Sequence, residues 1–188
     1  MSEEGNLSEK KVRNIFLTGP PGSGKTTVIK KVLSKLERKA TGFHTEEIKK
    51  NSKRVGFLMK TLDGNEGLLG HENIKSRFYI RRYGVSIENI ETLAIPSITP
   101  QSEDEIIIID EIGKMECFSE KFCMAAVKAL DTRNIVLGTI AVGGTDFIRE
   151  IKERKDIKVY EVTTQNRDEL PGNLIREIEW FFKDSSGI

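Results

Sequence analysis

The sequence has little of what marks secreted or membrane proteins. Two cysteines, Cys117 and Cys123, are too few for a disulfide framework and favour a reducing compartment. Six residues apart in one predicted helix, they are expected on different faces, as buried reduced thiols. The longest aliphatic run, residues 106–109, is far shorter than the roughly 18 apolar residues of a membrane helix. Residues 1–13 are polar and lack the apolar core of a secretory signal, so we expect a cytoplasmic protein without membrane contact.

The sequence also has no excess of charge of either sign. Its 30 lysines and arginines oppose 29 acidic residues, for a formal net charge of +1. A dedicated nucleic-acid binder usually has a marked basic excess, so nucleic acid is not indicated as a partner. The hydrophobic share of 37% is enough for a core and excludes global disorder. We expect one domain at 14–183, monomeric rather than oligomeric, between a mobile tail at 1–13 and a frayed C-terminus at 184–188.

Short apolar runs alternate with stretches of helical periodicity along the chain. Strands are predicted at residues 14–18, 40–48, 54–62, 105–109, 134–140 and 157–163, and helices at 25–38, 86–93, 119–130, 146–153 and 171–182. Residues 79–83 form a further candidate strand, residues 95–102 are predicted as loop, and residues 67–70 are too few to assign. This alternation predicts an α/β fold, with a mainly parallel sheet and helices on both faces. The strands at 40–48 and 54–62 have no helix between them, so we expect an antiparallel extension at one edge.

A glycine-rich motif stands between the first strand and the first helix. Residues 19–26 match the phosphate-binding pattern G-x-x-x-x-G-K-[ST] at every fixed position. Glycine reaches the dihedral angles that turn successive N–H groups toward phosphate oxygens, and the helix adds the positive end of its dipole. Lys25 would place its charge on the β- and γ-phosphates, and the Thr26 hydroxyl is a ligand for Mg²⁺. The predicted nucleotide-binding residues of this motif are Gly19, Pro20, Pro21, Gly22, Ser23, Gly24, Lys25, Thr26 and Thr27.

A phosphate-binding loop of this kind needs an acidic residue that holds the water shell of the metal. This residue should follow a buried strand next to the strand that leads into the loop. Residues 106–109 are four isoleucines followed by Asp110 and Glu111, which fits the requirement. We expect Asp110 to join Thr26 at Mg²⁺, and Glu111 to orient or deprotonate the attacking water. The alternative is that both carboxylates only end a strand at the solvent edge.

Polar residues follow two further strands. Thr139 lies in the strand predicted at 134–140, where it would contact the γ-phosphate or the attacking water, or serve only as a β-branched strand residue. Asn166, Arg167 and Asp168 follow the last strand. A loop beyond the carboxyl ends of parallel strands is expected over the base or ribose of a nucleotide, so Arg167 is a predicted nucleotide contact.

Other charged side chains give weaker signals. An arginine that neutralises charge in the transition state could be any of Arg77, Arg81, Arg82, Arg149 and Arg167. His44 and His71 have no metal-ligand spacing and no partner cysteines, so both are expected to be non-catalytic.

Several classes of phosphate-loop protein are compatible with these residues. Residues 110–113 also read D-x-x-G, as in small GTPases, but residues 166–168 lack the lysine and the spacing of the guanine-reading N-K-x-D motif. A small-molecule kinase remains open because arginines suited to a lid cluster at 77–82. Glu111 directly after Asp110 favours water as the acceptor and therefore nucleotide hydrolysis. A nucleotide-dependent sensor is the third alternative.

The motifs together closely resemble the THEP1-type nucleoside-triphosphatases. The similar stretches are residues 19–27, 42–47, 110–116, 137–140 and 166–167, within roughly residues 14–180, and the block Asp-Glu-Ile-Gly-Lys-Met-Glu at 110–116 is the most specific. The resemblance implies a three-layer α/β/α P-loop fold of the additional-strand, RecA-like type. It also implies slow Mg²⁺-dependent hydrolysis of ATP, GTP and other nucleoside triphosphates. The pair Arg81-Arg82 departs from the family pattern, in which a lysine or a smaller residue is expected.

Overall fold

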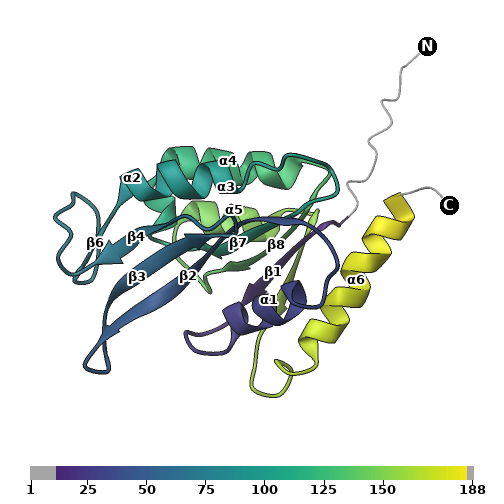
Figure 1. Ribbon diagram of the computed structural model, residues 1–188, viewed down its shortest axis with the longest axis horizontal. Coiled ribbons are helices and arrows are strands. Elements are labelled where there is room, and N and C mark those ends of the chain that lie inside the picture. Colours follow the sequence, from purple (N-terminus) through teal and green to yellow (C-terminus); the bar gives the residue numbers. More distant parts are fainter. Residues whose placement is uncertain (1–11, 186–188) are drawn as a thin grey trace, which may run out of the picture.

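A mixed sheet forms the centre of the protein, which is described here from a computed structural model (Figure 1). The structure describes residues 12–185, so most of the tail predicted at 1–13, and residues 186–188, lie outside the described residues. The described strands form one nine-stranded sheet in the order β5-β6-β4-β3-β2-β7-β8-β1-β9. Its parallel part consists of β2 (Ala40–Lys50), β7 (Ile106–Ile112), β8 (Ile135–Ile140), β1 (Asn14–Thr18) and β9 (Ile157–Glu161). The predicted α/β fold with a parallel centre is confirmed.

The predicted antiparallel extension continues the sheet beyond β2. It consists of β3 (Lys53–Thr61), β4 (Glu66–His71), β6 (Tyr83–Val85) and β5 (Tyr79–Ile80). Residues 67–70, which the sequence left unassigned, lie within β4. Residues 79–83 form two short strands rather than one, joined through Arg81 with a φ of +55°. The pattern did not reveal this turn because arginine is not a typical turn residue.

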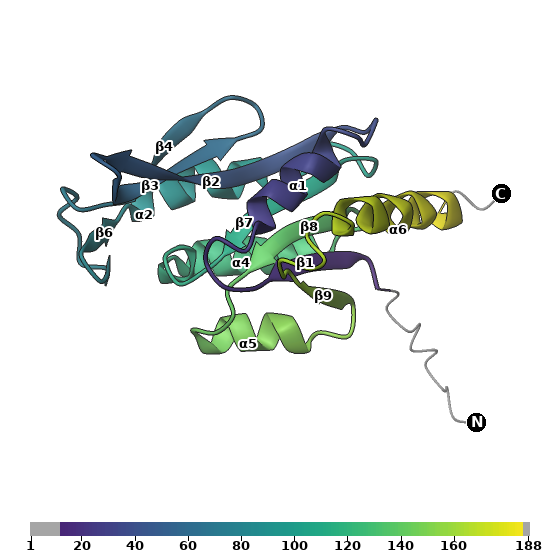
Figure 2. The same ribbon diagram turned by 90° about the horizontal axis from the view of Figure 1, so that it is seen from below.

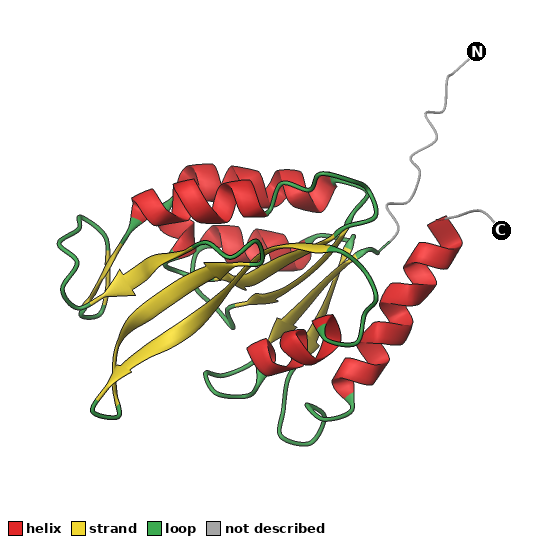
Figure 3. Cartoon of the chain, viewed as in Figure 1, coloured by secondary structure: helices red, strands yellow, loops and turns green. Residues whose placement is uncertain are grey.

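Helices cover both faces of the sheet (Figures 1 and 3). On one face α1 (Lys25–Leu33) and α6 (Leu170–Ser185) lie side by side (Figure 2). The other face carries α2 (Ile87–Asn89), the π-helical turn η1 (Ile90–Ala94), α3 (Ile95–Ser97), α4 (Glu120–Asp131) and α5 (Asp146–Glu153). This is the three-layer α/β/α arrangement that the family resemblance implies. Among residues 12–185, no helix has both the length and the apolar character needed to span a membrane.

The isoleucine run of β7 contributes to the core on both faces of the sheet. Ile106 and Ile108 belong to the cluster beneath α1 and α6, whereas Ile107 and Ile109 belong to the cluster beneath α4 and α5. Successive side chains of a strand point to opposite faces, so a continuous apolar run suits a strand that is covered on both sides. All four side chains are fully buried. The residue that follows them, Asp110, is therefore delivered into the interior.

The helices that the sequence predicts begin within one residue of the expected starts, but several end elsewhere. The bounds of α5 are those predicted, and α4 begins after Ser119, whose hydroxyl accepts a hydrogen bond from the Phe122 N–H (3.2 Å). Helix α1 ends at Leu33 instead of residue 38. Helical structure continues through η1 and α3 to Ser97, so the loop predicted from residue 95 begins later. Pro96 fits because it lies in the first turn of α3, where its fixed φ suits a helix.

The prediction that the two cysteines share one helix is wrong. Cys117 lies in the 3₁₀ helix η2 (Glu116–Phe118), Cys123 lies in α4, and the two thiols are close enough to shift each other's pKa. Both thiols are free and half-buried. The chain changes direction at Ser119, which has an extended conformation, so helical spacing does not determine how the two side chains are oriented.

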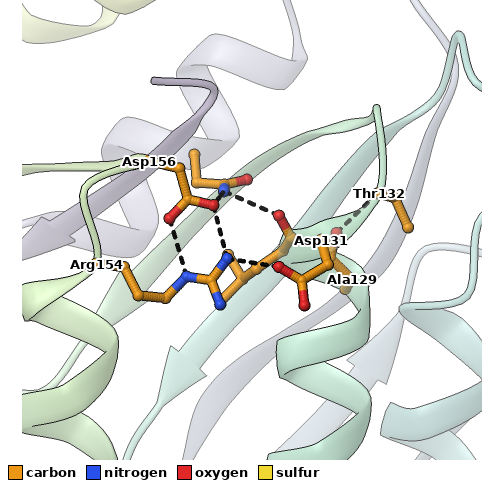
Figure 4. A network of polar contacts seen from close by, with 7 residues as sticks. Ala129, Asp131, Thr132, Arg154 and Asp156 are labelled. Carbon is orange, nitrogen blue, oxygen red and sulfur yellow. Dashed lines mark hydrogen bonds and ion pairs between the residues drawn. The ribbon is translucent and has the colours of Figure 1, made fainter. Parts of the chain in front are cut away.

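A network of polar side chains stabilises the sheet at the end of the parallel strands where β1 begins (Figure 4). Arg154 donates to both carboxylate oxygens of Asp156 (2.9 and 2.6 Å) and to Asp131 at the end of α4 (2.8 Å). The side-chain amide of Asn14 donates to Asp156 (3.4 Å) and to the Leu130 carbonyl (3.2 Å). The network thereby connects β1, α4 and the segment between α5 and β9. Asp156 is only 7% exposed, so Arg154 is an important counter-charge for it.

We predict that Arg154→Ala lowers the free energy of unfolding by about 1–3 kcal/mol, because it leaves a largely buried carboxylate without its strongest donor. Arg149→Ala is the matched control, since its exposed side chain pairs with the exposed Asp146 on the same helix. The control is expected to change stability by less than about 0.5 kcal/mol. Denaturant unfolding of both variants measures the difference, and equal stabilities would contradict a stabilising role for the network.

Candidate active site

The loop between β1 and α1 has the backbone conformation of an anion cradle. Gly19, Gly22 and Gly24 have φ angles of +140°, +80° and +105°, in the region that L-residues rarely adopt. A Cβ on Gly19 would also lie 2.9 Å from the carbonyl oxygen of Val162. Gly24 precedes the first residue of α1, so the unpaired N–H groups of the first helical turn face the loop. The glycines therefore wrap the chain around the positive end of the helix.

Lys25 lies across this loop at the start of α1. Its Nζ donates to the carbonyl oxygens of Gly19 (2.8 Å) and Pro20 (3.3 Å). The N–H of Ser23 also donates to Pro20 (3.2 Å), which closes the turn. A cation held within the cradle is suited to bind phosphate oxygens. Thr27 follows in the first turn of α1, with its side chain exposed.

The acidic pair lies at the end of β7, but β7 is not next to β1 as the sequence argument requires. Strand β8 pairs with both and lies between them. This extra strand is the arrangement that the family resemblance implies. Asp110 nevertheless lies near the phosphate loop, because the Thr26 side chain is close enough to its carboxyl group to lower the pKa of that group. Asp110 is only 2% exposed, so the alternative of a residue at the solvent edge is wrong for it.

Thr139 orients Asp110 from the neighbouring strand β8. The fully buried Thr139 hydroxyl donates to Asp110 Oδ1 at 2.5 Å. Burial raises the pKa of Asp110, while the hydrogen bond from Thr139, the nearby Thr26 side chain and the nearby charges of His44 and Lys25 oppose that rise. Thr139 is thus more than a β-branched strand residue, because its hydroxyl contacts the carboxyl group of Asp110.

The residues around Asp110 fit a hard divalent cation. Within residues 12–185, Asp110 Oδ2 is buried and has no hydrogen-bond partner, and the Thr26 side chain lies near the same carboxyl group. Oxygen ligands of this kind suit Mg²⁺, which keeps several waters and binds through few protein groups. The described part of the chain holds no cluster of three or more histidine, cysteine or acidic side chains suited to a metal. A cation here would therefore depend on water and phosphate oxygens for most of its ligands.

Glu111 lies beside the cradle and is half-buried. Burial raises the pKa of its carboxyl group and the charge of Asp110 adds to that rise, whereas Lys25 and Lys152 lower the pKa. Lys152 reaches this region from α5, where its Nζ donates to the Val142 carbonyl (2.8 Å). Glu111 thus lies within the electrostatic field of the lysine that occupies the phosphate loop.

The loop after β9 lies against the phosphate loop through Arg167. The Cδ atom of Arg167 is 3.5 Å from the position that a Cβ on Gly24 would occupy. Asn166 does not face a ligand, because its Oδ1 accepts the Thr163 N–H (2.9 Å) and its Nδ2 donates to the Glu161 carbonyl (2.8 Å). The carboxylate of Asp168 pairs with Lys31 of α1 (3.3 Å). Asn166 therefore shapes the turn that presents Arg167.

The other predicted arginines lie elsewhere. Arg82 donates to the Arg54 carbonyl and to the Tyr83 hydroxyl, and Arg149 pairs with Asp146. The edge of the sheet formed by β5 and β6 carries Arg77, Arg81 and Arg82. Five strands lie between this edge and β1.

The comparison with known proteins agrees with this arrangement. Residues 14–175 match the family described as NTPase. The chain belongs to this family. A nucleoside-triphosphatase THEP1 from Thermotoga sp. (strain RQ2) is 39% identical over 167 residues, which cover 88% of this chain and 95% of the relative. The human cancer-related nucleoside-triphosphatase is 37% identical over 180 residues, which cover 87% of this chain and 95% of that protein.

A solved structure in the family has the same fold. The crystal structure of THEP1 from the hyperthermophile Aquifex aeolicus has a TM-score of 0.81 at 33% identity, and the match covers 88% of this chain and 99% of that one. The predicted resemblance to the THEP1-type proteins is thereby confirmed. It supports the additional-strand topology, in which β8 separates the phosphate-loop strand from the acidic strand.

Three residues near the acidic pair received no role from the sequence. His44 of β2 lies next to Asp110 of the adjacent strand β7, although it lacks any metal-ligand spacing. Lys152 reaches Glu111 from a distant helix, so no local pattern could indicate it. Glu116 belongs to the block at 110–116 that carries the family resemblance, and its position five residues after Glu111 gave no periodic signal. The structure shows it buried beside the pair.

Proposed function

We propose that the protein is a Mg²⁺-dependent nucleoside-triphosphatase that hydrolyses ATP, GTP and other nucleoside triphosphates to the diphosphate and phosphate. The observation that carries this proposal is the position of Glu111 in the field of Lys25, directly after Asp110. A carboxylate at the place where a γ-phosphate is bound is suited to activate water. Family membership supports the same activity, because the relatives are named nucleoside-triphosphatases.

The phosphate loop provides the binding energy for the triphosphate. The N–H groups of Gly22, Ser23, Gly24, Lys25 and Thr26 cradle the β-phosphate. Lys25 exchanges its bonds to the Gly19 and Pro20 carbonyls for bonds to phosphate oxygens. Thr26 and Asp110 would hold Mg²⁺, and the ion would supply positive charge at the β- and γ-phosphates.

Glu111 orients the attacking water and accepts its proton. As bonds to the γ-phosphoryl group change, Lys25 stabilises the charge on its oxygens, so positioning and electrostatics supply most of the catalysis. Arg167, which contacts the loop at Gly24, is the arginine best placed to add charge there. The edge arginines are separated from β1 by five strands, so the lid that motivated the kinase alternative lacks structural support.

The loop after β9 supports broad base tolerance. The Asn166 amide is engaged by backbone groups of its own turn, so it is not free to read a base edge. The experiment that tests the function is phosphate release from ATP, GTP, CTP and UTP, with and without Mg²⁺. Comparable release from several nucleotides is expected, and tight binding without release would favour a kinase or a sensor.

We predict that Glu111→Gln keeps nucleotide binding and lowers turnover by about 100-fold or more, because glutamine fills the same space but cannot accept the proton. Phosphate release and nucleotide affinity are measured in parallel. Glu150→Gln, on the exposed side of α5, is the matched control and should retain full turnover. Unchanged turnover in Glu111→Gln would remove Glu111 from the mechanism.

Lys25→Ala is expected to lose both binding and hydrolysis, because it removes the cation from the centre of the cradle. Calorimetric titration with Mg-ATP measures the loss. Lys35→Ala, which removes an exposed lysine beyond the end of the same helix, should bind as the unmodified protein does. Tight Mg-ATP binding by Lys25→Ala would be incompatible with the phosphate-loop assignment.

Thr139→Val is predicted to raise the Mg²⁺ concentration required for half-maximal activity by about tenfold, because Asp110 loses the hydroxyl that orients it. Thr139→Ser keeps the hydroxyl and should show the normal Mg²⁺ requirement. Titration of activity with Mg²⁺ at fixed ATP distinguishes the two variants. Identical Mg²⁺ curves for valine and serine would show that this hydrogen bond does not act on the metal.

A further inference from the structure

A third carboxyl group lies beneath the catalytic pair and has no part in the mechanism above. Glu116 begins the 3₁₀ helix η2 and is only 4% exposed. Its Oε2 accepts a hydrogen bond from the Gly113 N–H at 3.1 Å. A charged carboxylate at such a buried position is costly unless a cation or several donors compensate it. The presence of a carboxyl group at this buried position therefore has to be explained by its surroundings.

The turn after β7 folds Glu116 back toward Glu111. The Cys117 N–H donates to the Gly113 carbonyl (3.1 Å), which closes the turn, and the Ala141 N–H fixes the preceding residue through the Ile112 carbonyl (3.1 Å). Residues 113 to 117 therefore form one tight loop at the end of the strand. The sequence places Glu111 just before this loop and Glu116 within it.

Both carboxyl groups lie close to Gly113. A Cβ on Gly113 would lie 2.8 Å from Glu116 Oε2 and 3.5 Å from Glu111 Cδ. Both groups thus flank the same Cα atom, and glycine leaves the space that they occupy. Two carboxyl groups packed this closely in a buried region cannot both carry a full charge at low cost.

The surroundings determine which of the two holds the proton. Burial, followed by the charge of Glu111, raises the pKa of Glu116 well above its usual range. Glu116 is almost fully buried, and the Gly113 N–H donates a hydrogen bond to its carboxyl group. Glu111 by contrast is half-buried and has Lys25 and Lys152 nearby. The more deeply buried Glu116 is therefore the group that holds the proton.

We propose that Glu116 is a positioning residue for the hydrolytic reaction: in its neutral form it donates a hydrogen bond to the Glu111 carboxylate and holds the other Glu111 oxygen toward the attacking water. This inference rests on the proposed hydrolytic role of Glu111. Glu116 does not contact the nucleotide and exchanges no proton with it. Its hydroxyl fixes the direction in which Glu111 accepts the proton of water, as buried donors commonly orient catalytic groups.

Two substitutions at Glu116 separate this role from simple packing. Glu116→Gln keeps the shape and an N–H donor and is expected to retain kcat within about threefold. Glu116→Leu keeps the volume but has no donor, so kcat should fall by about tenfold or more with KM unchanged. Gly113→Ala tests the same contact without altering Glu116, because its Cβ would displace the carboxyl group, and it too should lower kcat rather than raise KM.

An infrared measurement tests the proton without relying on activity. The difference spectrum between the unmodified protein and Glu116→Gln should contain a protonated-carboxyl band, and Glu111→Gln should shift that band. If the unmodified protein released no phosphate, the proposed function would be wrong. The band would still show whether Glu116 is protonated. The inference would be overturned by the absence of the band, by normal kcat in Glu116→Leu, or by equal losses in the leucine and glutamine variants.

Discussion

Three carboxyl groups gather at the end of one buried strand, and the site is arranged around that concentration of negative charge. Burial raises the pKa of Asp110, Glu111 and Glu116. Each group has a different compensation: hydroxyl donors for Asp110, lysines for Glu111 and backbone N–H groups for Glu116. Like charges in a region of low dielectric repel one another strongly. A divalent cation and a firmly held proton are the two additions that would let three acids share this space.

The two ends of the parallel strands have different roles. At the end where β1 begins, Arg154 pairs with the carboxylates of Asp156 and Asp131 and holds the end of a helix against the strands. At the opposite end, Asp110 Oδ2, Ser23 Oγ and Thr18 Oγ1 are buried without a partner within residues 12–185, whereas the network contains one such atom, Asn14 Oδ1. Unpartnered buried atoms reduce stability, and ligands commonly restore the missing bonds. Most of the unused bonding capacity among these buried side chains thus lies at the end of the strands that carries the phosphate loop.

The sequence predicted the parts of the fold that follow from local chemistry. The phosphate-loop spacing, the isoleucine strand and the helix at 146–153 each depend on residues that are neighbours in the chain. The position of β8 between β1 and β7 could not be derived in this way, because strand order depends on packing between distant segments. The same reason explains why Lys152 and Glu116 were missed. Their proximity to Glu111 arises from a helix packed across the sheet and from a turn with no distinctive spacing.

The extra strand also explains how Thr139 comes to act on Asp110. Adjacent strands lie about 4.8 Å apart, so β8 widens the separation between β1 and β7 to about twice that distance. Thr139 stands on this intervening strand, and its hydroxyl donates to Asp110 Oδ1 while Oδ2 has no partner within residues 12–185. The strand that separates the acid from the phosphate-loop strand thus also supplies the hydroxyl that orients the acid.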